Sequence, residues 1–318
     1  LSFSVDYFDK QTKDMLCWMP LPDFAGYSSI RTNVGTVSNT GVEFDATYKF
    51  RASDINFSVT GNASYVKNEV IDQGVEDAQA LNNLGGGLGG SVSHRMNGYP
   101  YGFFYGYVQD GIYQNQTEVD KAIQSNVVIG GIRWKDVDKN GKIDAADRTM
   151  IGKPNPDWTY GLMLTADYKG IDFSAFFQGV TGAQIYKLYR RGNVVRANFG
   201  KEWLGRWHGE GTSTKYPVLY EGNLTPSGGD TGANLVSDLY VEDGDYFRLK
   251  VLQIGYTLPV AWTKKALISK LRLFLQGENL FTLTGYTGLD AEVGTRDGFD
   301  GGTYPQPRIL TFGFNVSF

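Results

Sequence analysis

The sequence predicts an all-β protein, a transmembrane antiparallel β-barrel with long extracellular loops, on three observations. Eight segments alternate apolar and polar residues with a period of two, which places the apolar side chains of a strand on one face. Very short and very long connections alternate between these segments. The last segment ends on the C-terminal Phe318, with an unbroken apolar face opposite a small, polar one. Such strands suit a wall with lipid outside and water or a plug inside.

Composition excludes several other classes. No run of about 18 apolar residues occurs, so transmembrane helices are not expected. The net charge of −4 provides no positive field for a nucleic-acid partner. The single Cys17 excludes an internal disulfide framework, and two histidines argue against histidine-based catalysis or zinc binding. No signal peptide is visible, so we expect residues 1–318 to be the C-terminal part of a longer exported protein.

The first three predicted strands are Ser2–Phe8, Gly41–Phe50 and Ile55–Val66. Alternation is nearly perfect in the third, where one face carries large apolar residues and the other only small polar ones. The apolar set is Ile55, Phe57, Val59, Ala63 and Tyr65, and the polar set is Asn56, Ser58, Thr60, Asn62 and Ser64.

The next two predicted strands are Asp157–Tyr168 and Ile171–Gly179, joined by a two-residue turn. The apolar face of the first begins with Trp158 and ends with Tyr168. A tilted strand needs about 9–11 residues to span a bilayer, and aromatic rings favour its interfaces. This spacing therefore predicts an aromatic girdle at each membrane surface.

The last three predicted strands are Tyr246–Leu258, Leu271–Leu280 and Arg308–Phe318. The first of them changes phase around Val251-Leu252, so that its apolar residues switch faces. One extra residue in a strand produces such a change, and we therefore predict a β-bulge there.

The lengths of the connections distinguish a membrane barrel from a soluble β-sandwich, which also alternates but places turns every 8–12 residues or so. The short connections are Arg51–Asp54, Lys169-Gly170 and Pro259–Lys270. The long ones are Asp9–Thr40, Lys67–Pro156, Val180–Asp245 and Phe281–Pro307. If Phe318 ends at the periplasmic rim, every long connection is extracellular. Tyr101–Tyr113 is strand-like, but a ninth span would break this parity, so we assign it to the extracellular segment.

Six ordered motifs carry a resemblance to a known family. They are Asn33-x-Gly35-x-x-x-Asn39-x-Gly41-x-Glu43, Gly106–Tyr113, the acidic run Asp136–Asp147, Ile151–Pro156, Asn279–Glu292 and Tyr304–Arg308. In this order and spacing, from about Leu1 to Phe318, the chain resembles the C-terminal barrel region of SusC/RagA-type TonB-dependent outer-membrane transporters. One departure is Ala291 between Asp290 and Glu292, where the family usually has proline.

The resemblance implies the last eight or so strands of a barrel of about 22 strands. It further implies an N-terminal plug, a signal sequence and a TonB-box region that this chain lacks. Members of the family import oligosaccharides or, in some cases, peptides through the Gram-negative outer membrane with energy transmitted by TonB. They pair with a SusD-like surface lipoprotein that forms a lid over the extracellular mouth.

The acidic run matches a calcium-binding loop. Ca²⁺ prefers six to eight hard oxygen ligands, and a glycine permits the sharp turn between them. The ligands would be Asp136, Asp138, Asn140, the backbone carbonyl of Lys142, Asp144 through water, and Asp147. Asp147 replaces the usual glutamate and reaches less far. The alternative is a polar turn whose Asp and Asn side chains cap the backbone. A bound ion would be structural, because no nucleophile or base accompanies it.

The sequence identifies residues that contact substrate less clearly than it identifies metal ligands. Aromatic rings and basic residues of the long connections are candidates for contacts to substrate or partner: Tyr101, Phe103, Tyr105, Trp203, Trp207, Arg190 and Arg191. The alternative for each ring is that it packs the loops together or contacts the lid protein, and for each arginine that it is solvated. The run Gly85–Gly90 lacks the Lys-Ser/Thr of a phosphate loop and is interpreted as a loop tip.

No catalytic constellation is expected. Asp290 and Glu292 are paired acids, but turn formation explains them, and His208 has no serine or cysteine nucleophile pattern beside it. Two further hypotheses besides nutrient import stay open. One is a surface receptor or adhesin barrel that binds without transport. The other is a secreted β-rich carbohydrate-binding protein with a calcium loop.

Overall fold

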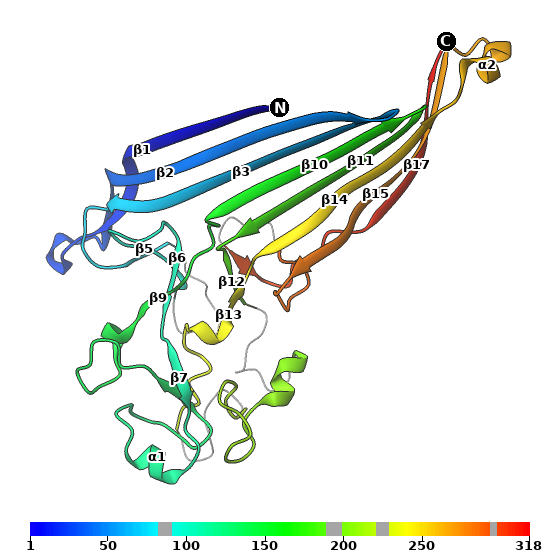
Figure 1. Cartoon of the computed structure of the whole chain (residues 1–318). Coiled ribbons are helices and arrows are strands. Elements are labelled where there is room, and N and C mark those ends of the chain that lie inside the picture. Colours follow the sequence, from blue (N-terminus) through cyan, green and yellow to red (C-terminus); the bar gives the residue numbers. More distant parts are fainter. Residues whose placement is uncertain (82–90, 189–198, 221–228, 293–297) are drawn as a thin grey trace.

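The centre of the computed structural model is an eight-stranded antiparallel sheet (Figure 1). The structure describes residues 1–81, 91–188, 199–220, 229–292 and 298–318. The strand order is β1-β2-β3-β10-β11-β14-β15-β17. Their bounds are Ser2–Pro20, Ser29–Ala52, Ile55–Asp72, Trp158–Tyr168, Ile171–Thr181, Tyr246–Thr257, Lys270–Thr284 and Ile309–Ser317. All eight strands predicted from alternation are confirmed.

The first long connection differs from the prediction. Most of Asp9–Thr40 is strand, because β1 and β2 continue together and leave a turn of residues 21–28 that contains η1 (Asp23–Ala25). Two register shifts around Met15 break the alternation there. The residues of this extension that follow the outward-facing Tyr7 on the same face, Asp9 and Gln11, are polar. The pattern of a membrane strand therefore ends before the strand does.

The register places the apolar residues of neighbouring strands side by side on one face of the sheet. One continuous row crosses seven strands through Tyr48, Val59, Leu164, Ala175, Leu252, Gly277 and Leu310. Many side chains of this outer face are exposed, including Phe3, Phe312 and Phe314. An apolar face of this extent matches the lipid-facing surface of a barrel wall.

The opposite, inner face is polar and its side chains bond across strands. Gln253 and Gln276 are joined by a hydrogen bond of 2.7 Å, and Arg272 donates to Gln253 at 2.8 Å and forms an ion pair with Asp172. Cross-strand pairs of this kind stabilise a sheet without apolar packing. The inner face thus suits a lumen that holds water or a plug.

The predicted bulge lies one residue before Val251. Phe176 pairs with Val251 and Phe177 with Leu249, which leaves Lys250 without a ladder partner on β11. Since Leu249 and Leu252 both face outward, the extra residue keeps the apolar row continuous on both sides of the bulge.

The long connections gather at one end of the sheet and the short ones at the other (Figure 1). We call the described residues of 73–157, 182–245 and 285–308 the loop assembly. It contains three small sheets, β4-β5-β6-β9, β7-β8 and β13-β12-β16. Their strands are Gln79–Ala80, Ser93–Arg95, Phe103–Gly106 and Thr149–Gly152; Gln109–Ile112 and Ile132–Trp134; and Val241–Asp243, Gln184–Lys187 and Phe299–Asp300. Residues 101–113 contribute β6 and β7 and no ninth strand of the large sheet, as predicted.

The helices are short. Within the described residues the α-helices are α1 (Gln116–Asp120) and α2 (Val260–Thr263), and the 3-10 turns besides η1 are η2 (Ala145–Asp147), η3 (Lys201–Gly205), η5 (Asp238–Tyr240) and η6 (Lys264–Ala266). None of the helices that the structure describes is long and apolar enough to cross a membrane. The loop assembly has its own core, in which Phe104, Tyr186 and Trp134 are almost fully buried.

Residues 1–318 expressed alone should not give a stable, soluble monomer. Within the described residues the sheet has two edges, β1 and β17, and exposed edges with large apolar faces promote association. We expect aggregation without detergent in size-exclusion chromatography. A monodisperse, β-rich species in plain buffer would contradict the assignment of the outer face to lipid.

Adjacent residues at the middle of β10 test the assignment of the two faces. Leu164 points outward and Thr165 inward. In the full-length protein, Leu164→Arg should destabilise the membrane-inserted state by about 2–4 kcal/mol, because arginine meets lipid at mid-bilayer. Thr165→Arg should cost much less, since the lumen is polar. Urea unfolding from lipid vesicles measures both, and equal costs would argue against the predicted orientation.

Candidate functional site

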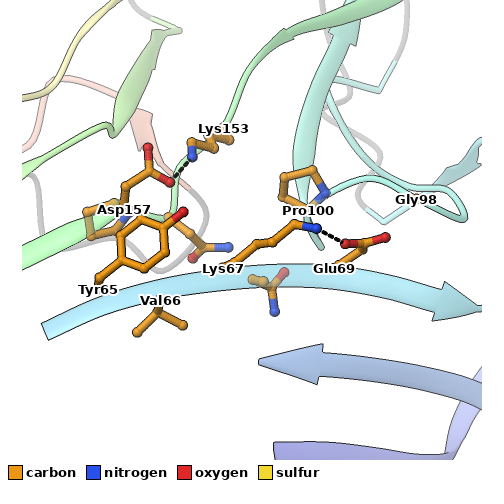
Figure 2. Close-up of a pocket in the computed structure, with 11 residues that line it drawn as sticks. Tyr65, Val66, Lys67, Glu69, Gly98, Pro100, Lys153 and Asp157 are labelled. Carbon is orange, nitrogen blue, oxygen red and sulfur yellow. Dashed lines mark hydrogen bonds and ion pairs between the residues drawn. The ribbon is translucent and has the colours of Figure 1, made fainter. Parts of the chain in front are cut away.

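A notch lies in the wall where β3 loses its neighbour. β10 begins at Trp158, and the last backbone contact before it runs from Val66 N–H to the Asp157 carbonyl at 3.0 Å. Farther along β3, Val70 pairs instead with Gly98 and Tyr99, at 2.8 and 2.9 Å. Between these contacts lies a cavity of about 260 Å³, which we call the wall notch (Figure 2).

Charges in the wall notch are paired with one another. Lys67 and Glu69, both on β3, form an ion pair at 2.5 Å, and Lys153 pairs with Asp157 (Figure 2). Each positive group is therefore compensated locally, so the notch offers no net charge to a ligand.

A larger cavity of about 650 Å³ lies between β1–β3 and the residues of the loop assembly near β5. We call it the mouth cavity. Its β2 and β3 residues, including Asn39 and Asn68, belong to the polar inner face. Asn68 donates to Asn39 Oδ1 at 2.7 Å and accepts from the Tyr101 N–H at 2.7 Å, and Asn155 donates to the Tyr101 carbonyl at 3.2 Å. These amides tie the loop assembly to the barrel wall.

The candidate aromatic residues near β6 have different surroundings. Tyr101 lines the mouth cavity. Phe103 is fully buried and its ring stacks on Tyr99 at 4.9 Å, while the half-buried Tyr105 contacts Phe103 edge-on. The ring of Phe103 thus packs the loops together, which is the alternative stated for it above.

The other residues predicted to contact substrate or partner also differ in burial. Trp203 is 2% exposed and packs on Tyr216 in the core of the loop assembly. Trp207 is half-buried and donates from Nε1 to Gln114 at 3.2 Å. Arg190 and Arg191, like the run Gly85–Gly90, lie outside the described residues.

The acidic loop brings three of its predicted ligands together. Carboxylate oxygens of Asp136, Asp138 and Asp147 lie within 4.8 Å of one another. Asp147 is fully buried and accepts from Val137 N–H and Asp144 N–H, both at 2.8 Å. The carboxylate of Asp147 at the end of the loop therefore bonds back to the loop's own backbone and closes it.

The remaining predicted ligands serve turns in this structure. Asn140 Oδ1 accepts from the Lys142 N–H at 2.8 Å, and the Asp144 carboxylate caps η2 by accepting from Ala146 at 2.8 Å. Partial removal from water opposes ionisation of Asp136, but N–H groups led by that of Gly141 outweigh it and lower its pKa. Asp136 is thus an anion at neutral pH, as a cation ligand must be.

Charged residues hold the last long connection on the wall. Arg248 of β14 is 3% exposed and pairs with Asp290 and with Glu292, and Lys250 donates to Glu292 at 2.7 Å. Burial opposes ionisation of Asp290, but the Arg248 guanidinium and two N–H groups outweigh it and lower the pKa of that carboxyl. Both acids that could suggest a glycosidase are therefore engaged in ion pairs with Arg248 or Lys250.

A second buried charge pair joins two other loops. Lys187 is 2% exposed and pairs with Glu242 of β13 and with Thr287. Burial is outweighed by Lys187 and by the Thr287 N–H, so the pKa of Glu242 is lowered. No local sequence pattern indicates this pair, because its partners are 55 residues apart.

Comparison with known proteins gives consistent results. No family model matches the chain. TonB-dependent receptor P3 of Formosa agariphila is 33% identical over all of this chain and 32% of its own length, and TonB-dependent receptor P26 of the same organism is 30% identical over 99% and 32%. TonB-dependent receptor SusC of Bacteroides thetaiotaomicron is 24% identical over 99% and 30%.

Among solved structures, the RagAB peptide importer in its open-open state superposes with a TM-score of 0.77 at 25% identity, over 99% of this chain and 32% of that chain. The chain spans about a third of the length of the proteins it matches. The apolar outer face, the polar inner face and the whole-length similarity all indicate the wall of a transmembrane barrel. The chain is homologous over its full length to TonB-dependent receptors of the SusC/RagA type.

Proposed function

We propose that the protein containing this chain imports a nutrient across the Gram-negative outer membrane with energy transmitted by TonB. The observation that carries the proposal is the whole-length similarity to TonB-dependent receptors, together with a wall that is apolar on one face and polar on the other. The eight strands would form part of the barrel wall, with outer-membrane lipid against the outer face. The loop assembly would be extracellular.

The finer parts of the proposal concern partners and substrate. A SusD-like lipoprotein would cover the loop assembly, as the similarity to SusC and to the RagAB peptide importer supports. The substrate would be an oligosaccharide or a peptide. The amide contacts of the mouth cavity and the Arg248 ion pairs would hold the loops in place on the wall while lid and plug move. The protein would have no enzymatic role.

The proposal is tested on the native protein extracted from the outer membrane. We expect a chain about three times as long as these 318 residues, together with a co-purifying surface lipoprotein. Uptake of the bound nutrient should stop when the proton-motive force is collapsed, while binding at the cell surface persists. Binding without any energy-dependent uptake would instead indicate a receptor that does not transport.

We further propose that the loop of Asp136, Asp138, Asn140, Lys142, Asp144 and Asp147 binds a structural Ca²⁺. The support is the convergence of three carboxylates and the closure of the loop by Asp147. The ion would reduce the repulsion among these three carboxylates and fix the chain between β8 and β9.

Calcium binding is measured by titration of the full-length, EDTA-treated protein, with melting temperature as a second readout. Calcium should raise the melting temperature, because it binds the folded loop only. Asp136→Asn should weaken binding at least about tenfold by removing a charged ligand. Asp120→Asn, an acid of α1 outside the loop, is the matched control. Equal affinity in both variants would show that the loop is only a capped turn.

A further inference from the structure

We propose that the connection between β14 and β15 binds the headgroups of acidic phospholipids in the inner leaflet of the outer membrane. We call residues 259–269 of this connection, which contain α2 and η6, the rim turn. The rim turn lies at the end of the sheet opposite the loop assembly, beside the C-terminus (Figure 1). The proposal rests on the proposed function, which places the loop assembly outside the cell and therefore the rim turn at the periplasmic end.

The rim turn is longer than a reversal of the chain requires. Each of the other two short connections consists of two residues, Ser53-Asp54 and Lys169-Gly170. The charges of these two connections compensate each other, because Asp54 forms an ion pair with Lys169 at 3.2 Å. The rim turn, by contrast, carries Lys264 and Lys265 and has no acidic residue in its sequence. It thus adds positive charge to this end of the sheet.

The large apolar side chains of the rim turn are exposed. Val260 is 57% exposed, Trp262 68% and Leu267 84%. The backbone of Leu267 is left-handed, with a φ of 57°, a conformation that favours glycine or asparagine. Reversal of the chain alone would therefore not select leucine at this position. A leucine side chain presented there indicates contact with an apolar surface.

The exposed side chains continue the lipid-facing surface of the wall. Tyr256 of β14 and Leu273 of β15 pair directly on the outer face. Leu258 and Leu271 follow on the same face, and the Leu258 N–H donates to the Leu271 carbonyl at 2.9 Å. The chain leaves the outer face at Leu258 and returns to it at Leu271. The rim turn therefore borders the lipid-facing surface at both of its ends.

Hydrogen bonds attach the rim turn to the last strand. The N–H and the Oγ of Ser269 donate to the Ser317 carbonyl of β17 at 2.8 and 3.0 Å. Thr263 is 5% exposed, and its carbonyl accepts from the Ile268 N–H at 3.4 Å. The rim turn is therefore a folded unit, which holds its apolar and basic side chains next to each other.

Tryptophan and lysine together suit the surface of an anionic membrane. The indole ring of Trp262 favours the interface between lipid and water, because one part of the ring is apolar and its N–H is polar. A segment with apolar and basic side chains lies in that interface and binds anionic lipid more tightly than neutral lipid. Each lysine near such a surface strengthens binding roughly fivefold. Lys264 and Lys265 thus provide the preference for acidic headgroups, from which a headgroup without net charge gains little.

The experiment uses the full-length protein in lipid nanodiscs that contain a photoreactive lipid. The discs carry photoreactive phosphatidylglycerol, phosphatidylcholine or lipopolysaccharide at equal mole fraction. After illumination, cleavage after glutamate gives the peptide of residues 243–278 in every variant, and its fragmentation locates the label. At low salt, phosphatidylglycerol should label residues 259–269 at least about threefold more than phosphatidylcholine. The ratio should approach unity at about 0.5 M salt, because salt screens the charges.

Substitutions separate the contribution of charge from that of the apolar side chains. Lys264→Gln combined with Lys265→Gln should bring the labelling ratio close to unity. Trp262→Ala should lower labelling by both phospholipids. Lys169→Gln is the matched control, because it removes a lysine from another short connection, and it should leave the ratio unchanged. The melting temperature of each variant checks that it stays folded.

Three results would contradict the proposal. Equal labelling of the rim turn by the two phospholipids would exclude a preference for acidic headgroups. No label in residues 259–269 would show that protein, such as the plug, covers the turn. Stronger labelling by lipopolysaccharide would overturn the assignment to the inner leaflet. The labelling requires no transport, so the expected pattern without energy-dependent uptake would support the lipid site and overturn import.

Discussion

The structure depends on one constraint, the register of the antiparallel ladder. Side chains alternate with a period of two, so a slip by a single residue would move a whole apolar set from lipid to lumen. Six strand pairings keep the row from Tyr48 to Leu310 on one face. The bulge at Lys250 preserves this register, because the extra residue is left out of the ladder. Without the bulge, the apolar residues on one side of it would face inward, either Phe247 and Leu249 or Leu252 and Ile254. The two faces then differ enough in polarity to separate lipid from an aqueous lumen.

The mouth of the wall follows a different rule, because there the ladder opens. β3 continues past the start of β10, and its free backbone is partly satisfied by residues 98 and 99 of the loop assembly. Side-chain contacts then fix the loops as well. Hydrogen bonds of the amides around Asn68 hold the loops at one place, and ion pairs of the buried Arg248 and Lys187 hold them at two others. Removing one partner of such a buried pair leaves an uncompensated charge, so these contacts are costly to break.

Alternation made the eight strands predictable, because it is a local pattern that lipid and lumen impose on every wall strand. The extension of β1 and β2 was not predictable, since beyond Tyr7 the outward positions become polar. Ligand spacing was sufficient to bring Asp136, Asp138 and Asp147 together. The burial of Trp203 and the pairing of Lys187 with Glu242 could not be predicted from the sequence, because both depend on contacts between loops far apart in the chain. Asn68 likewise had no sequence signal, and only the structure shows it between Asn39 and Tyr101.

Asn68 and Asn155 line both the wall notch and the mouth cavity. Near the loop assembly the same two side chains lie between the two spaces, whereas along β10 a continuous hydrogen-bonded ladder separates the two faces of the sheet. The boundary between the two sides of the wall is therefore built differently at its two levels. Along β10 it is the hydrogen-bonded backbone, which no substitution of a side chain removes. Beyond the start of β10, Asn68 and Asn155 line both spaces, so a substitution at either residue would change the boundary itself.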